Sequence, residues 1–416
     1  MNNLIKIFGL LFILPLCCFG ANNASNTKTT TYVVQQSVSL PNKLIVYVDR
    51  STKHSTQLIL SGVSMGVANQ VQNVMCDRRL IKEDKPGIWS VPENCQKLSW
   101  QIPLLENGTE PAAKQQSLKT GNFILLSDVA SIPHLQDASS AEAIKIEIQG
   151  TKTIFPTPNS TGLIPLPNSS AAPIFILLNA TVVDSITSGS IKLTYLLDNP
   201  KLVSALPDVT SHMNGLKWLN TIIPGRENEN FVIAWLGTSK KQMTLSGATG
   251  NDILLANYPN DGELTFGKAM LLYVALHEAL HQFALHYPNQ PSWVAESLAA
   301  YYGARAVQIA LPNDPKSDAL MRRFQTDGDH FTNGLLIINR KVQKGDRSEY
   351  GAFYTKGLAF WMAVDEALQT QGDALNNHLL AVLKTKYDSR GNPTDLQKGL
   401  NISPEIWASL RYRFLD

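Results

Sequence analysis

Cysteine is scarce in this sequence of 416 residues, which contains 4 of them. Cys17 and Cys18 lie close to the N-terminus, so only Cys76 and Cys95 remain in the rest of the chain. This scarcity excludes a small scaffold held together by many disulfides, and it excludes a zinc site made of four thiolates. A metal centre in this chain would therefore draw its ligands from histidine and carboxylate side chains.

An excess of either charge is also missing, since 36 Lys and Arg residues face 34 Asp and Glu residues and leave a net charge of +2. Charged residues make up 17% and apolar residues 44% of the chain, as in ordinary globular proteins. The length makes two domains a reasonable expectation. Without a strongly basic or acidic balance, the sequence gives no reason to expect nucleic acid as a partner.

Long apolar runs are missing as well, apart from a short one within residues 1–20, MNNLIKIFGLLFILPLCCFG. This run is too short to span a membrane comfortably, and a lysine precedes it as in secretory leaders. We therefore predict a signal peptide over residues 1–20 with cleavage before Ala21, export to the periplasm or the extracellular space, and no stable membrane insertion after cleavage. A lipid anchor on Cys17 or Cys18 is a weaker alternative, because the residue before either cysteine is not the preferred Gly or Ala.

The two cysteines beyond this leader are expected to form one disulfide in an exported protein, Cys76–Cys95. It would close a loop around the turn-rich residues 83–93. The alternative, two free thiols, would be unusual in an oxidising compartment.

The N-terminal half is rich in short runs of Val, Ile, Leu and Tyr that turn residues separate. Such runs predict the strands of an antiparallel sandwich or open sheet, so we assign residues 21–200 to an N-terminal β-rich domain. Residues 155–173, rich in Pro, Ser and Asn, are predicted to form a loop. No cluster of reactive residues occurs in this half, which favours a packing platform over an independent binding module. The predicted strands span residues 31–40, 43–48, 56–60, 97–103, 122–126, 144–149, 174–183 and 190–197.

Residues that can bind a metal ion and act as a general base occur together in the motif HEALH, from His277 to His281. Residues four apart lie on the same face of a helix, so the two imidazoles can bind one metal ion. Glu278 follows the first histidine directly and can act as the general base towards a metal-bound water. The surrounding stretch is strongly apolar, and His and Glu are costly to bury there unless they are paired or bind a metal.

A third ligand is available in residues 293–303, WVAESLAAYYG, which contain Glu296. A second helix that returns antiparallel to the motif helix would bring this carboxylate over the two histidines. Two imidazoles and one carboxylate, with a fourth position left to water, are the ligand set of a catalytic zinc site. We therefore predict one Zn²⁺ per chain, bound by His277, His281 and Glu296.

The elements around the motif predict a catalytic zinc-binding subdomain over residues 201–303. Residues 211–223 have the pattern of a short helix, and residues 230–237 and 252–257 have the pattern of strands. A strand beside a zinc site can offer its edge to an extended peptide, which then adds to the sheet.

Helical patterns dominate the last quarter of the chain, so residues 304–416 are predicted to form a helical C-terminal subdomain. Strands and helices are thus segregated along the sequence, which predicts an α+β fold. The predicted helices span residues 303–311, 317–325, 352–370 and 373–385.

Two segments that follow the HExxH motif carry a family resemblance. Residues 293–303 have the pattern W-x-x-E-x-x-x-x-Y-Y-G, and Tyr354 begins a Y-x-K-G segment. At this distance behind HExxH they resemble the gluzincin metallopeptidases, the M61 glycyl aminopeptidase family most and the M1 aminopeptidases more distantly. The resemblance implies a thermolysin-like catalytic domain, Glu296 as the third zinc ligand, and a Tyr354 hydroxyl that stabilises the tetrahedral intermediate. Tyr350 is a weaker candidate for contact with the substrate.

The sequence also departs from this family pattern. The separation between His281 and Glu296 is shorter than in the relatives. Residues 247–252, GATGND, stand where the relatives carry a Gly-rich motif whose glutamate binds the free amine of the substrate. Gly250 is a weak candidate for substrate contact in this segment, but it offers no carboxylate. Aminopeptidase and endopeptidase activity therefore both stay open.

These residues together predict a secreted zinc metallopeptidase that acts on peptides or proteins, with Glu278 and Tyr354 as its catalytic residues. The alternative from another class is a catalytically retired peptidase fold that binds a partner outside the cytoplasm. A structural zinc protein is less consistent with the sequence, because structural sites usually have four protein ligands and favour cysteine.

Overall fold

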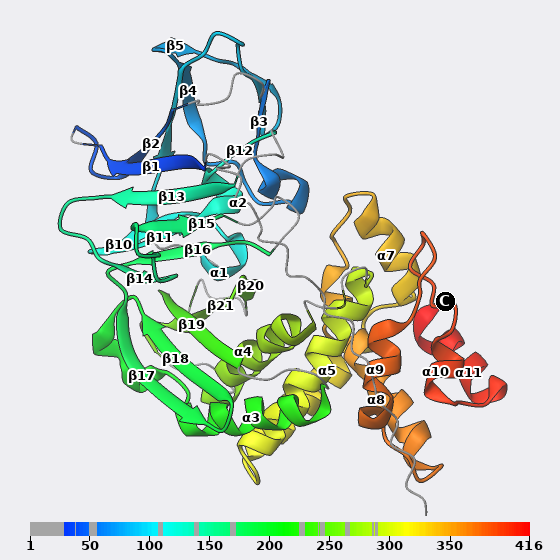
Figure 1. Cartoon of the computed structure of the whole chain (residues 1–416). Helices are drawn as coiled ribbons and strands as arrows, with labels where there is room; N and C mark the ends of the chain where they lie inside the picture. The colour runs from blue at the N-terminus through cyan, green and yellow to red at the C-terminus, as the bar shows by residue number, and fades with distance from the viewer. Residues whose placement is uncertain are drawn as a thin grey trace, which may run out of the picture.

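The computed structural model describes residues 29–37, 39–49, 56–106, 111–136, 141–166, 172–223, 229–239, 241, 246–262, 267–284, 287 and 290–416. Figure 1 shows β-sheets from the N-terminal part at one end, a further sheet with its helices beneath them, and the C-terminal helices beside that sheet. This arrangement confirms the predicted α+β fold. The predicted signal peptide, residues 1–20, lies outside the described residues.

The largest N-terminal sheet has seven strands in the order β15-β13-β1-β2-β8-β4-β5. Alternate residues of its strands are buried, as the period of two in a half-buried strand requires; Leu44, Val46 and Val48 are the buried ones in β2. Its strands are β1 (Thr30–Gln36), β2 (Lys43–Asp49), β4 (Gln72–Cys76), β5 (Arg79–Leu80), β8 (Lys97–Pro103), β13 (Glu142–Glu147) and β15 (Leu163–Pro165).

Two smaller sheets complete the N-terminal part, with strand orders β14-β16-β11-β10-β9 and β12-β3-β7-β6. The strands of the first are β9 (Leu105–Glu106), β10 (Leu118–Thr120), β11 (Phe123–Ser127), β14 (Thr153–Phe155) and β16 (Phe175–Leu178). Those of the second are β3 (Gln57–Ile59), β6 (Glu83–Lys85), β7 (Ile88–Ser90) and β12 (His134–Leu135). Three short helices connect them: η1 (Ser61–Met65), α1 (Pro111–Lys114) and α2 (Asp128–Ser131).

Two details of the N-terminal prediction are wrong. Residues 155–173 are not only a loop, because β14 ends within them and β15 pairs with β13. The pairing is also not purely antiparallel, since β1–β13 and β9–β10 are parallel pairs. Strands β14 and β15 are each three residues long, which is too short for a period of two to be recognised among prolines and serines.

The predicted disulfide is present between Cys76 and Cys95, whose Cα atoms are 5.6 Å apart. It joins the end of β4 to the segment that leads into β8, and both cysteines are buried. The bond therefore lies within the N-terminal part.

A five-stranded sheet with the order β17-β18-β19-β21-β20 supports the motif helix. Residues 181–197 pair within this sheet and not with the N-terminal sheets, although they fall inside the predicted N-terminal domain of residues 21–200. The strand predicted over residues 174–183 is interrupted at Asn179, whose φ of 57° is left-handed and ends the extended backbone. The strands are β17 (Thr181–Ser188), β18 (Ile191–Leu197), β19 (Glu229–Thr238), β20 (Gly247–Gly250) and β21 (Ile253–Pro259).

Helices α3 (Val209–Ile222) and α4 (Gly267–Ala284) pack against this sheet, and α5 (Ser292–Ala310) packs against both helices (Figure 1). Asp208 caps α3, because its side chain accepts a hydrogen bond from the Ser211 backbone N–H. Nearly every residue of α4 is buried, which explains why its sequence is apolar all round. Gly303 of α5 permits a close approach, since a Cβ there would lie 3.1 Å from the His277 Cα atom.

The C-terminal part is helical, as predicted, and its apolar side chains continue the core of the motif helix. Residues 303–311 are the end of α5 rather than a separate helix, and α7, α10 and α11 were not predicted. The elements here are α6 (Pro315–Gly328), α7 (Leu335–Gln343), η4 (Tyr350–Phe353), α8 (Lys356–Gln369), α9 (Leu375–Lys384), α10 (Leu396–Leu400), α11 (Pro404–Leu410) and a π-helical turn, η5 (Arg411–Leu415), whereas η2 (Pro200–Ala205) lies between β18 and α3. Among the described residues, none of the helices has the length and apolar character needed to cross a membrane.

Candidate active site

Helices α4 and α5 bring the three predicted metal ligands together. The Nε2 atoms of His277 and His281 are 3.2 Å apart, and they lie 3.3 and 3.4 Å from the Glu296 Oε2 atom. Tetrahedral zinc with bonds of about 2.0–2.2 Å separates its ligand atoms by about 3.3–3.6 Å. The three donors therefore have the chemistry and the spacing that a zinc ion requires.

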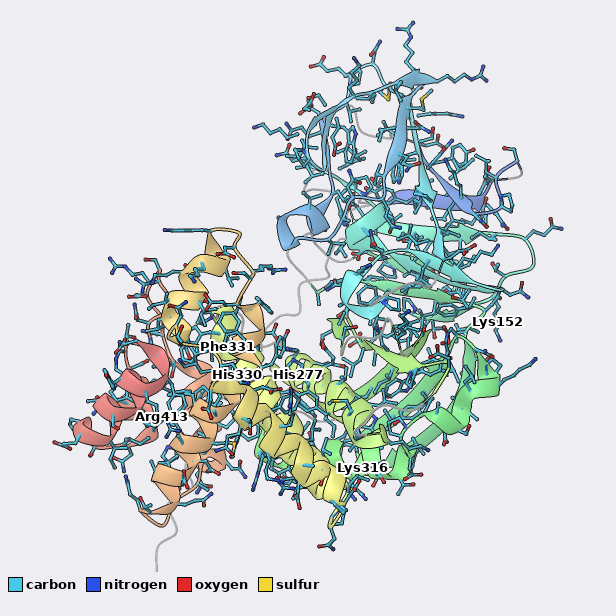
Figure 2. The ribbon with its side chains drawn as sticks, turned by 180° about the vertical axis from the view of Figure 1, so that it is seen from behind. Lys152, His277, Lys316, His330, Phe331 and Arg413 are labelled. Atoms are coloured by element: carbon cyan, nitrogen blue, oxygen red, sulfur yellow. A yellow bond between two sulfur atoms is a disulfide. The ribbon has the colours of Figure 1, made fainter. Side chains whose placement is uncertain are left out.

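Burying the side chains of His277, His281 and Glu296 costs free energy unless their charges balance one another. The His277 side chain is 6% and the Glu296 side chain 18% exposed. Burial alone would raise the pKa of Glu296, but the adjacent imidazoles of His281 and His277 hold the pKa of that carboxyl well below its usual range. Figure 2 shows His277 among the helices, below the N-terminal sheets in that view.

Glu278 is held by the edge strand β20. The Thr249 hydroxyl lies 2.7 Å from the Glu278 Oε2 atom, to which it can donate a hydrogen bond. Gly247 makes room for the same side chain, because a Cβ there would lie 2.5 Å from the Glu278 Cγ atom. The contact of Thr249 and Gly247 with Glu278 was not predicted from the sequence. The one feature that could have indicated it is their place in a Gly-rich segment shortly before the motif helix.

Two tyrosines from the C-terminal subdomain face the metal ligands. The Tyr350 hydroxyl donates a 2.9 Å hydrogen bond to the Glu296 Oε1 atom, the oxygen that does not face the histidines. The Tyr354 ring lies beside His277, with 5.5 Å between the ring centroids. Burial and the Glu296 carboxylate raise the pKa of both phenols, so both stay protonated and can donate. Tyr350 thus contacts a predicted ligand, whereas the sequence suggested contact with the substrate.

Two cavities adjoin the site. One, of about 330 Å³, is largely apolar and is lined by Tyr273, Val274 and Phe324 next to His277. The other, of about 710 Å³, extends past His281 and Glu296. Its lining residues are Gly66, Val67, Ala68, Ala113, Lys114, Gln115, Gln116, Gly247, Ala248, Thr249, Glu278, His281, Gln290, Ser292, Ala295, Glu296, Arg347, Tyr350 and Tyr354. Both cavities share Glu278 and Tyr354, so space for a ligand exists on both sides of the catalytic residues.

Gly250 lines neither cavity. It is buried under the N-terminal part, where a Cβ would lie 2.6 Å from the Phe175 ring and 2.8 Å from the Pro173 carbonyl oxygen. A larger side chain therefore has no room at this position. Among the described residues that line the two cavities, the carboxylates are Glu278 and Glu296.

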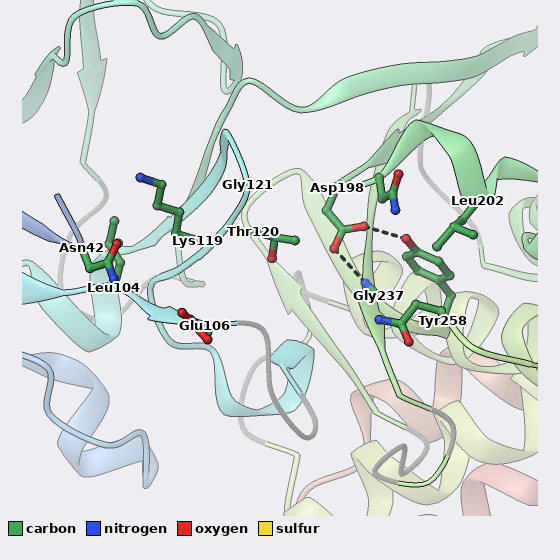
Figure 3. Close-up of a pocket in the computed structure, with 12 residues that line it drawn as sticks. Asn42, Leu104, Glu106, Lys119, Thr120, Gly121, Asp198, Leu202, Gly237 and Tyr258 are labelled. Carbon is green, nitrogen blue, oxygen red and sulfur yellow. Dashed lines mark hydrogen bonds between the residues drawn. The ribbon is translucent and has the colours of Figure 1, made fainter.

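A further cavity of about 490 Å³ lies away from this site, between the N-terminal part and the sheet that carries α4 (Figure 3). Asp198 accepts hydrogen bonds there from the Gly237 N–H at 2.9 Å and from the Tyr258 hydroxyl at 2.8 Å. Burial raises the pKa of Asp198, and these bonds oppose the rise. The cavity shares no lining residue with the two at the metal ligands, and we interpret Asp198 as a structural link between strands.

No family model matches the sequence, and no curated protein matches it. Solved structures do match. An aminopeptidase N family protein from Idiomarina loihiensis has a TM-score of 0.64 and 13% identity, over 93% of this chain and 76% of that chain. The M1 zinc metallopeptidase of Deinococcus radiodurans has a TM-score of 0.50 and 11% identity, over 93% and 92% of the two chains. A mutant two-domain M1 zinc metallopeptidase bound to L-tryptophan has a TM-score of 0.52 and 11% identity, over 93% and 94%.

At such low identity the likeness shows the fold alone. The matches cover 93% of this chain, so they extend over the N-terminal sheets as well as the helices that carry the site. The chain has the fold of the gluzincin metallopeptidases, in the form found in M1 enzymes.

Proposed function

We propose that this protein is an exported zinc-dependent metallopeptidase that hydrolyses peptide bonds. The observation that carries the proposal is the triangle of His277, His281 and Glu296 donor atoms, with sides of 3.2–3.4 Å, directly beside Glu278. The fold and the cavities on both sides of these residues support the same function. The solved relatives include an enzyme bound to a Tyr-Ser-Ala substrate.

Each residue of the site has a role in this mechanism. Zinc bound by the three ligands would lower the pKa of a water molecule towards neutrality. Glu278, oriented by Thr249, takes a proton from the attacking water and delivers it to the leaving amine. Tyr354 donates a hydrogen bond to the oxyanion of the tetrahedral intermediate. Tyr350 keeps Glu296 in place through its 2.9 Å hydrogen bond.

Export is part of the proposal. The apolar leader in residues 1–20 supports it, and so does the disulfide between Cys76 and Cys95, because such bonds persist in oxidising compartments. The closer kinship with M61 is supported by the motif residues alone, since the solved structures described above are an aminopeptidase N family protein and M1 enzymes.

The alternative is a retired peptidase fold that binds a partner. Gly250, enclosed by Phe175, favours this alternative over a standard aminopeptidase, because it offers no carboxylate for a free amine. The intact set of Glu278, Tyr354 and the three ligands supports catalysis instead.

Mass spectrometry of a mixed peptide library, incubated with the zinc-loaded protein and with the Glu278→Gln variant, tests the proposal. We expect cleavage by the wild type and a loss of about 10²–10⁴-fold in the variant, because general base catalysis contributes that much. The cut positions would show whether the enzyme trims N-termini or cleaves internally. Zinc-loaded wild type that cleaves no peptide would favour the binding protein.

A further inference from the structure

The larger cavity at the site carries positive charge on two walls. Arg347, in the loop before η4, lines it from the C-terminal subdomain, and Lys114, at the end of α1, lines it from the N-terminal part. The carboxylates among its described lining residues are Glu278 and Glu296, and both belong to the proposed catalytic site. The remaining space beside the metal ligands is therefore suited to a negatively charged group rather than to an ammonium group.

Arg347 is placed close to the catalytic residues. Its guanidinium carbon lies 5.1 Å from the centre of the Tyr350 ring, and the Tyr350 hydroxyl bonds Glu296 at 2.9 Å. The Arg347 Nη1 atom also reaches across the cavity, to 3.5 Å from where a Cβ on Gly66 would lie. A planar guanidinium stacked on an aromatic ring keeps its edge for bidentate contact with a carboxylate.

The acidic residues next to Arg347 in the sequence already have partners. Asp346 is exposed and accepts a hydrogen bond from the Ser348 backbone N–H at 3.0 Å. Glu349 pairs with Lys341 and accepts a hydrogen bond from Asn333 at 2.9 Å. Among the described residues, no ion pair joins Arg347 to a carboxylate, so its charge is directed towards the cavity and the solvent.

We propose that the larger cavity binds a carboxylate group of the peptide substrate through Arg347. The path from Glu296 through the Tyr350 ring to the guanidinium is short, and about three residues of extended chain would span it. The carboxylate therefore belongs to an Asp or Glu side chain, or to a C-terminus, within about three residues of the cleaved bond. This inference rests on the proposed function and names its substrate class.

The test measures binding and cleavage separately. Fluorescent peptides that share one core sequence carry Glu, Gln or Lys at single positions along it, and each is made with a free or an amidated C-terminus. Their affinities are measured by anisotropy on the zinc-loaded Glu278→Gln protein, which binds without turnover. The same measurement is made with Arg347→Gln added, and with Lys344→Gln added as the control. Lys344 is exposed, lies in the same loop and does not line the cavity.

We expect the Glu peptide to bind about tenfold more tightly than the Gln peptide at one or two positions, the scale of one charge-assisted hydrogen-bonded pair in a partly open site. Arg347→Gln should reduce this preference to less than twofold, whereas Lys344→Gln should keep it. A preference that follows the free C-terminus instead of the Glu position would identify that carboxylate as the source.

Equal binding of the Glu and Gln peptides with both kinds of C-terminus would overturn the inference, and so would an acidic preference that survives Arg347→Gln. Cleavage by the enzyme with Glu278 intact is scored independently. Acid-selective binding without any cleavage would refute the peptidase and leave the carboxylate site standing. Cleavage without acid selectivity would support the peptidase and refute the carboxylate site.

Discussion

Glu296 is bound on both of its carboxylate oxygens, and this gives the site its geometry at the scale of single residues. Its Oε2 atom faces the two histidines, and its Oε1 atom accepts the hydrogen bond of Tyr350. A carboxylate fixed in this way cannot turn away from a metal ion without breaking a bond. Tyr350 is therefore expected to act through the ligand, while Tyr354 acts on the reacting group.

Replacing Tyr350 by Phe tests this division of roles. We expect Tyr350→Phe to weaken zinc binding by about 10–100-fold, the usual effect of removing a hydrogen-bond partner of a metal ligand. Competition with a chromogenic chelator measures the affinity. Tyr354→Phe is the matched control, because it leaves the Tyr350–Glu296 bond in place; it should keep the affinity and lose turnover. Equal zinc affinities in both variants would contradict the assignment.

Asp128, in the N-terminal part, is expected to make stability depend on pH. Burial raises the pKa of Asp128 from 3.8 to about 6, so the folded protein favours the protonated form. The stability it contributes is complete below pH 3.8 and is lost as the pH rises through 6. Asp128→Asn keeps an acceptor for the Val129 and Ile174 N–H groups. In urea denaturation at pH 7, its free energy of unfolding should be about 1–3 kcal/mol higher than that of the wild type. The difference should disappear at pH 4, and a constant difference across this range would disprove the account.

Strand β20 and helix α4 act together at the scale of secondary structure. Thr249 bonds the general base, and Gly247 leaves the space in which its side chain lies. The strand thus sets the position of Glu278 as closely as its own helix does.

Gly247→Ala tests this contact. A Cβ would lie 2.5 Å from Glu278 Cγ and 2.6 Å from Oε1, so the carboxylate must move. Because a displaced catalytic group is costly in rate, we expect kcat/KM to fall about 10²-fold while the zinc content stays unchanged. Gly399→Ala on α10 is a suitable control, since its Cβ would meet the nearest atom at an ordinary 3.4 Å. Wild-type kcat/KM in Gly247→Ala would show that β20 does not position the base.

The sequence predicted the parts of the site that have a local pattern. His277, Glu278 and His281 are linked by helical spacing, and Glu296 lies at the start of the next helix, so their meeting follows from one helix pair. Thr249 could not be predicted in the same way, because its partner lies 29 residues away and depends on how the sheet packs on α4.

The sheet that residues 181–197 join could not be predicted for a similar reason. Residues 181–197 look like any other strands, and only their partners show which sheet they join. Strand composition carries little information about pairing over long separations, so the sequence predicted the existence of the strands and the overall α+β class but not this assignment.

The N-terminal part forms one wall of the cleft at the scale of the whole molecule. Helix α1 lines both cavities, and the Ala112 N–H donates a buried 3.0 Å hydrogen bond to the Asn257 side chain of β21. This bond ties the wall to the sheet beneath the site. The interpretation of the N-terminal part as a packing platform is therefore incomplete, since its residues line the cavities directly.

Asn257→Ala should loosen that wall. An unpaired buried N–H costs about 1–3 kcal/mol, so we expect lower thermal stability together with a raised KM for peptide and unchanged zinc content. Asn260→Ala, at an exposed position in the same segment, is the control and should change none of the three. A raised KM in the control, or an unchanged KM in Asn257→Ala, would refute the link between this bond and the cleft.

The central claim is that His277, His281 and Glu296 form one metal centre, and the zinc content of the purified protein tests it most directly. Elemental analysis of the wild type, Glu278→Gln and His281→Ala should give one zinc per chain in the first two and almost none in the third. Zinc-free wild type after incubation with zinc, or equal zinc in His281→Ala, would contradict the account.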